Sequence, residues 1–369
     1  MVRRLAPALL VACAGGGEDA VVADATADVA DAAVEGSTDA VDAVEAEAPT
    51  PSECWSAGAW VASAAFADAG HVSHPLPSFA RAGVYYVHTM NVAGSGDRVL
   101  QAARVGADGA LSPWFAASPD HGGGPHGYTA IVVDGEAFHF RNGHIARYPF
   151  DAAGKMTGDV VLLEKSTSTS FGGAQFVWDT AVYAPFASGA KWAFHLGGFS
   201  FTPYAYRPEV SRSAVPIGSA FSAPLGKHPA ARPGKSVFVA GKTGGFVFTG
   251  ESAASSLFRA AAQADGALDA WTPVGPLPAG TGNERGDLFV KGRTLFTVRG
   301  AKVFATDVAA DGKLGAWTAM PSLPEDQIDV GWGDGHLEGA AWGLVGDVAL
   351  LTGPKRVFST RLVGRPCGN

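Results

Sequence analysis

The sequence lacks any run of about 18 uncharged apolar residues, the length that a membrane-spanning helix needs. It therefore predicts no transmembrane helix. It also lacks a Gly-x-Ser-x-Gly motif that would place a serine nucleophile on a strand-to-helix turn. The glycines at 122–124 are not followed by a Lys-Ser or Lys-Thr pair, so the sequence does not predict a phosphate-binding loop.

Basic residues are missing from one long segment of the chain. Between Ala14 and Glu53 there are eleven acidic residues and no Lys or Arg, and this segment accounts for the net charge of −8. The chain from residue 54 onward is nearly neutral, so it has no excess of positive charge for a phosphate backbone. We therefore expect no nucleic-acid partner.

The first thirteen residues have the order of a secretory signal. Arg3 and Arg4 precede a short apolar stretch that ends in Leu10-Val11-Ala12-Cys13. This ending resembles the lipobox of bacterial lipoproteins. The resemblance implies that residues 1–12 are a signal peptide, that Cys13 is lipidated, and that the protein is exported to the outer membrane or cell surface. We expect the lipid to be its only contact with the membrane.

Residues 13–53 are the predicted lipidated cysteine and a tether. This segment has no aromatic residue and consists almost entirely of Ala, Asp, Glu, Val, Gly and Thr. It has too little apolar surface to offset the entropy of ordering, and its like charges repel each other. We predict a disordered acidic tether that leads to one folded domain over residues 54–369.

Repeats divide this domain into similar units. Copies of Asp-Gly-x-Leu-x-x-Trp begin at Asp108, Asp265 and Asp311, and degenerate copies begin at Ala153 and near residue 214. Short apolar runs surround each copy, and an Asp-Gly pair favours a tight turn with positive φ. The pattern predicts four short strands in each unit of about 50 residues.

These units resemble the repeats of kelch and galactose-oxidase-like β-propellers. The run that ends in Gly197-Gly198, followed by Tyr204 and Tyr206, matches the kelch pattern best. The resemblance implies an all-β fold, a β-propeller with six four-stranded blades. Seven blades stay possible because the interval from residue 159 to residue 271 is long.

The two ends of the domain complement each other. The last unit ends without its own Trp, whereas the segment ending in Trp60 resembles the segment ending in Trp317. We therefore predict that the N-terminal strand completes the last blade. Cys54 and Cys367 lie at opposite ends of the domain, and an exported protein can form disulfides. We predict that they pair, which leaves no cysteine for the Cys–Tyr crosslink of copper-radical oxidases.

The predicted topology places the connection from each outer strand to the next inner strand on one face. Six such segments are longer than the Asp-Gly turns, and they contain six of the ten histidines. Functional residues tend to lie on loops that a rigid scaffold holds in place. We therefore predict ligand-binding residues on these segments: His74, His121, His126, Tyr128, Trp178, Asp179, His228, Arg232, Arg285, Trp332 and His336.

Metal binding is the sharpest chemical possibility on these segments. His121 and His126 place two imidazoles on one glycine-rich stretch, with Asp120 beside them. A first-row metal ion needs three or four ligands, and glycine-rich segments with histidines are usually plain connections. We therefore assign no metal and no cofactor from the sequence.

The sequence favours a binding or scaffold module whose ligand is a protein or a glycan, and we expect a monomer. We name no catalytic residue. The alternative is a carbohydrate-active enzyme of the mutarotase, lyase or hydrolase type. In that case His336, Glu338 and Arg285 are the candidate acid–base and carboxylate-binding groups.

Overall fold

A computed structural model describes most of the domain from residue 53 onward. The described residues are 53–66, 78–90, 98–118, 129–141, 144–158, 160–163, 176–177, 180–197, 199–201, 204–206, 208–218, 225–230, 235–251, 256–279, 288–324, 341–353 and 356–367. The signal peptide, Cys13 and the tether lie outside them. Every regular element in these ranges is a β-strand, and they contain no apolar helix of membrane-spanning length.

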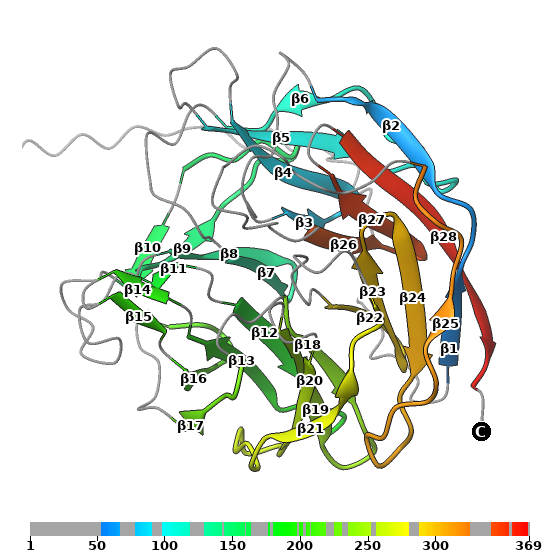
Figure 1. Cartoon of the computed structure of the whole chain (residues 1–369). Coiled ribbons are helices and arrows are strands. Elements are labelled where there is room, and N and C mark those ends of the chain that lie inside the picture. Colours follow the sequence, from blue (N-terminus) through cyan, green and yellow to red (C-terminus); the bar gives the residue numbers. More distant parts are fainter. Residues whose placement is uncertain are drawn as a thin grey trace, which may run out of the picture. The chain divides into compact units, whose positions relative to one another are not determined.

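Six antiparallel sheets form the blades of a β-propeller (Figure 1). Blade I contains β3 (Ser78–Arg81), β4 (Val84–Met90), β5 (Arg98–Arg104) and β6 (Phe115–Ala116). Blade II contains β7 (Thr129–Val133), β8 (Glu136–Arg141), β9 (His144–Tyr148) and β10 (Val160–Leu163). Blade III contains β12 (Thr180–Pro185), β13 (Lys191–Leu196), β16 (Glu209–Ala214) and β17 (Gly226–Lys227).

The remaining three blades follow in chain order. Blade IV contains β18 (Val237–Ala240), β19 (Gly245–Glu251), β20 (Ser256–Ala262) and β21 (Thr272–Pro276). Blade V contains β22 (Leu288–Lys291), β23 (Thr294–Arg299), β24 (Lys302–Asp307) and β25 (Thr318–Ala319). Blade VI contains β26 (Ala341–Val345), β27 (Val348–Thr352), β28 (Arg356–Pro366) and, from the N-terminus, β1 (Glu53–Ala57), with β2 (Val61–Ala65) also paired to β28.

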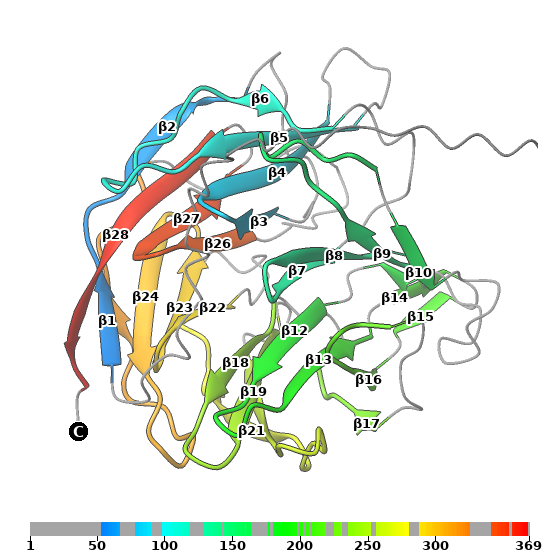
Figure 2. The ribbon, with the colours of Figure 1, turned by 180° about the vertical axis from the view of Figure 1, so that it is seen from behind.

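Blade III explains the long interval that left seven blades possible. Between its second and third strands the chain forms a hairpin of β14 (Phe199–Phe201) and β15 (Tyr204–Tyr206). The hairpin pairs with β11 (Phe176–Val177), which precedes the first strand of the blade. The additional residues therefore build a small three-stranded sheet, and the ring has six blades, as expected. Both views place this sheet beside β10 (Figures 1 and 2).

The antiparallel order gives the ring two different faces. The first strands of successive blades contact one another around the ring. The turns from the first to the second strand and from the third to the fourth strand therefore lie at one face, which we call the turn face. The ends of the strands that flank the six long connections lie at the opposite face, which we call the loop face.

The Asp-Gly motif and its degenerate copy Ala153-Gly154 form the same turn in four blades. Gly109, Gly154, Gly266 and Gly312 all have positive φ, between 76° and 86°. Each turn is closed by an isolated bridge between residues six apart, such as Val105 with Leu111. In three of the turns the Asp carboxylate also accepts the backbone N–H two residues later, at 2.9–3.0 Å. The turn chemistry predicted from the sequence is confirmed.

Each of these turns packs against the preceding blade. In three of the four turns an arginine on the third strand of that blade donates to a carbonyl oxygen of the turn: Arg104 to Ala153 (3.5 Å), Arg212 to Asp265 (2.8 Å) and Arg259 to Asp311 (2.9 Å). The guanidinium groups of Arg212 and Arg259 also lie over the rings of Trp192 and Phe246. The repeated motif is therefore a contact between neighbouring blades at the turn face.

Apolar packing follows the same plan. The buried apolar residues of the described chain form six clusters, one between each pair of neighbouring blades. Side chains alternate along a strand, so Tyr85 packs toward blade VI and Tyr86 toward blade II. Trp60, Trp114, Trp271 and Trp317 each pack against the cluster between their own blade and the preceding one.

The N-terminal strand closes the ring. Residues Glu53 to Ala57 of β1 pair with Pro366 to Leu362 of β28, and the Cys54–Cys367 disulfide joins the two ends with Cα atoms 4.9 Å apart. Both predictions from the sequence are confirmed. The bridge spans 313 residues, and chain-entropy estimates for so long a loop reach about 5 kcal/mol.

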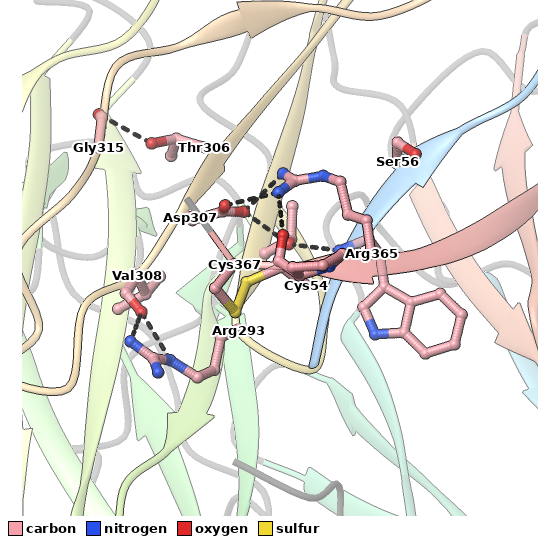
Figure 3. Close-up of polar contacts among 12 residues, drawn as sticks. Cys54, Ser56, Arg293, Thr306, Asp307, Val308, Gly315, Arg365 and Cys367 are labelled. Atoms are coloured by element: carbon pink, nitrogen blue, oxygen red, sulfur yellow. Dashed lines mark hydrogen bonds and ion pairs between the residues drawn. A yellow bond between two sulfur atoms is a disulfide. The ribbon is translucent and has the colours of Figure 1, made fainter. Parts of the chain in front are cut away.

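Polar contacts join this closed blade to blade V (Figure 3). The Trp55 backbone N–H donates to the Thr294 hydroxyl at 2.9 Å, and that hydroxyl donates to Asp307 at 2.9 Å. Arg365 donates two bonds of 2.8 Å to the Asp307 carboxylate. The bidentate Arg365–Asp307 pair, partly shielded from water, fixes the end of β28 against blade V, and the bond from Trp55 fixes β1 there.

Replacing Gly266 by Ala tests the contact between turn and preceding blade. A Cβ at residue 266 would lie 2.6 Å from a Trp192 ring carbon, whereas a Cβ at Gly189, which has a similar φ of 86°, has nothing within 4 Å. We expect Gly189→Ala to lower the free energy of unfolding by about 1–2 kcal/mol from backbone strain alone. Gly266→Ala should cost about 1–3 kcal/mol more because of the clash. Urea unfolding of both variants measures the difference, and equal losses would contradict the role of the contact.

Candidate ligand-binding face

The loop face is where the sequence placed its candidate ligand residues. Of these, His228 lies within the described residues, and the other ten lie outside them. Trp178 and Asp179 occupy the two positions between the end of β11 and the start of β12, so the chain on either side of them is placed. For the remaining candidates the prediction stays as the sequence made it.

His228 is buried rather than exposed. It follows β17 at the outer edge of blade III and is 3% exposed. Its Nε2 lies 3.0 Å from the Gly197 carbonyl oxygen, and its backbone N–H donates to Pro208. Burial lowers the pKa of His228 to about 4, although the contact with Gly197 opposes this shift. The imidazole is therefore neutral at pH 7, and a direct contact with a ligand would first require the side chain to be uncovered.

Three further histidines were not among the ligand candidates predicted from the sequence. His88, His139 and His195 lie toward the loop-face ends of the second strands in blades I, II and III, and all three are buried. The rings of His88 and His139 lie across the boundary between blades I and II, with centroids 6.2 Å apart. Tyr148 bonds to Nδ1 of His139 through its hydroxyl. Each of these histidines follows an apolar residue near the end of a predicted strand. This recurring pattern is the sequence signal that could have identified them.

Hydroxyl groups link neighbouring blades at the same level of the ring. The Tyr85 hydroxyl lies 2.7 Å from both Ser78 and Thr352, which joins blade I to blade VI. Burial raises the pKa of Tyr85 to about 12, so the phenol stays neutral. The Thr180 hydroxyl accepts the Ser236 N–H at 3.1 Å, which joins blades III and IV. These bonds hold the inner strands where they meet the long connections.

A positive charge lies close to the centre of the loop face. Lys235 directly precedes the inner part of blade IV, and its ammonium donates to the Trp342 carbonyl oxygen of blade VI at 2.5 Å. Blades IV and VI are not neighbours, so the side chain reaches past blade V. Among the described residues, no group of three or more His, Cys, Asp or Glu side chains is arranged to hold a metal ion.

The three-stranded sheet brings four aromatic residues together in one hairpin of blade III. In its register Phe199 pairs with Tyr206 and Phe201 pairs with Tyr204. Cross-strand partners share a face, as do residues two apart in a strand. These four aromatic residues therefore belong to one face of the sheet, and Ser200 and Ala205 belong to the other.

The low pKa of His228 predicts a pH-dependent stability. The unfolded chain takes up this proton near pH 6.5, whereas the folded chain takes it up near pH 4, so stability falls as the pH drops through this window. We expect the protein to lose about 2 kcal/mol more between pH 7.5 and pH 5 than His228→Gln does, because one pKa unit corresponds to about 1.4 kcal/mol. Urea unfolding at both pH values measures this. Equal losses in the two proteins would show that His228 is not the group responsible.

Comparison with known proteins shows no close relative. No protein family model matches the chain, and no curated protein matches it. Similar solved structures include a gluconolactonase from Xanthomonas campestris, with 16% identity and a TM-score of 0.46 over 84% of this chain and 100% of that chain. They also include the structure of YjhT, with 10% identity and a TM-score of 0.48 over 79% of this chain and 97% of that chain. The Pseudomonas aeruginosa periplasmic gluconolactonase PpgL has 14% identity and a TM-score of 0.44 over 80% and 87%. These similarities are too distant to transfer a substrate or a residue role.

Proposed function

We propose that the protein is a lipid-anchored binding module of the cell envelope, and that it takes its ligand on the loop face. The observation that carries this proposal is the difference between the two faces. On the turn face, the short turns are held by arginines of the preceding blade. On the loop face, rigid inner strands lead into the six long connections, an arrangement that suits ligand binding.

A glycan is the ligand that the extra sheet favours. Aromatic rings stack on the apolar faces of sugars, and tyrosine adds a hydroxyl for hydrogen bonding. The register of β14 and β15 assigns Phe199, Phe201, Tyr204 and Tyr206 to one sheet face. None of the residues in β11, β14 and β15 is charged, which favours an uncharged sugar over a charged one. Protein ligands remain the other class that the sequence analysis named.

The anchor is tested by replacing Cys13. If lipid on this residue is the only attachment, Cys13→Ser should move the protein from the membrane fraction to the soluble envelope fraction, because a helical span is not predicted. Immunoblotting of the two fractions and mass spectrometry of the mature N-terminus measure this. Continued membrane association of Cys13→Ser would contradict the proposed anchor.

The binding face is tested on an array of neutral oligosaccharides with the full chain and matched variants. We expect the double variant Phe199→Ala/Tyr206→Ala to weaken binding about 10-fold or more, since aromatic contacts contribute about 0.5–1.5 kcal/mol each. Ser200→Ala, on the opposite sheet face, and Lys313→Ala, on the turn face, should bind like the unmodified protein. Equal effects of Lys313→Ala would contradict the assignment to the loop face. Release of shortened or rearranged sugars from the array would instead support the enzyme alternative.

A further inference from the structure

We propose that His228 is a positioning residue for the β14–β15 hairpin, and that acid loosens this hairpin by displacing the His228 ring. The hairpin leaves blade III after Gly197 and returns to it at Pro208. The Nε2 atom of His228 lies 3.0 Å from the Gly197 carbonyl oxygen, and its backbone N–H donates to the Pro208 carbonyl oxygen at 2.8 Å. A single residue therefore contacts both ends of the hairpin.

The other described contacts of the hairpin are made by the backbone. The Gly197 N–H donates to the Glu209 carbonyl oxygen at 2.8 Å, which joins the two ends directly. Strand β14 also pairs with the two residues of β11. Backbone groups do not titrate, so these contacts do not change with pH. The bond from the His228 ring is a side-chain contact at the same place, and its donor belongs to a group that can take up a proton.

The surroundings of the ring favour its neutral form. A carbonyl oxygen only accepts hydrogen bonds, so Nε2 carries the proton in the contact with Gly197, and a second proton would have to go to Nδ1. Nδ1 is buried and has no hydrogen-bond partner among the described residues. A charged ring at this place would therefore lose its hydration without gaining an acceptor in return.

The pKa of His228 reflects these surroundings. Burial is the largest effect and lowers this pKa to about 4, while the bond to Gly197 opposes the shift. Of the charged or titratable groups nearby, His195 on β13 lowers the pKa further and Glu209 on β16 raises it. Lys227 on β17 directly precedes His228 and pairs with Glu209 in the strand register. A displaced, solvated imidazole has a pKa of about 6.5, so acid between these values favours the displaced ring.

The consequence for ligand binding rests on the proposed function, in which this hairpin carries part of the binding face. The hairpin then holds its oligosaccharide more tightly at neutral pH than in acid. The sequence predicted His228 as a ligand-binding residue. In this arrangement it acts through the backbone of the hairpin, because its own ring is covered.

The experiment is amide hydrogen exchange of the full chain at pH 7 and pH 5, read by mass spectrometry on peptides that cover residues 199–206. After correction for intrinsic rates, we expect opening of the hairpin to increase about 10-fold or more at pH 5, because each pH unit below the pKa of the displaced ring is a factor of about ten. His228→Gln keeps an amide donor for Gly197 but does not titrate, so its opening should not change with pH. His228→Leu has no donor, and its hairpin should open about 10-fold more at both pH values.

The matched control is Tyr183→Phe, which removes a hydroxyl bond to Asp134 at the turn face of the same blade. It should leave the opening of the hairpin and its pH dependence unchanged. Opening of the hairpin in His228→Gln that changes with pH as in the unmodified protein would overturn the role of His228. Unchanged opening in His228→Leu would overturn it as well, and so would an equal effect of Tyr183→Phe.

The array of neutral oligosaccharides, probed with the same variants at both pH values, separates this inference from the proposed function. Weaker binding at pH 5 by the unmodified protein, without such a change in His228→Gln, would support both. The expected exchange results without oligosaccharide binding by any variant would contradict the proposed function and leave the positioning role supported. Equal affinity at both pH values, although the hairpin opens at pH 5, would contradict the placement of the ligand on this hairpin.

Discussion

The closure of the ring is the constraint on which the rest of the structure depends. A row of six blades ends in two unpaired edges, and only pairing of the first strand with the last removes them. Here β1 pairs with β28, the Cys54–Cys367 disulfide joins their ends, and Arg365 ties the closed blade to Asp307 of blade V. Without this closure the cluster that contains Trp60 would lose part of its cover between blades V and VI. In the closed ring every blade packs against two neighbours, so all six interfaces between blades are formed.

Packing between blades explains why one short motif recurs. The glycine of the Asp-Gly turn allows close approach to the aromatic ring and arginine of the preceding blade, and the Leu and Trp that follow enter the same interface. Each motif residue therefore contributes to contacts between sheets rather than within one sheet. The same contact between neighbouring blades therefore recurs around the turn face. The loop face is free to differ from blade to blade, as the additional sheet of blade III illustrates.

The histidines show how the packing of blades places residues that are far apart in the sequence next to each other. His88, His139 and His195 occupy similar strand positions, and the rings of His88 and His139 lie across the boundary between blades I and II. His228 is instead held at the Gly197 carbonyl, where burial keeps it neutral. Histidines on the same face therefore have different surroundings, and these surroundings depend on which blade or strand lies beside each histidine.

The sequence by itself determined the class of fold, the repeat, the closing strand and the Cys54–Cys367 pair, and it favoured six blades while seven stayed possible. These follow from local signals: alternating apolar residues, glycines at positive φ, and a Trp missing at one end and present at the other. Only the tertiary structure decided which blades the turns contact, that His228 is buried, and that His88 lies beside His139. Those facts depend on residues far apart in the chain, and no periodicity encodes them.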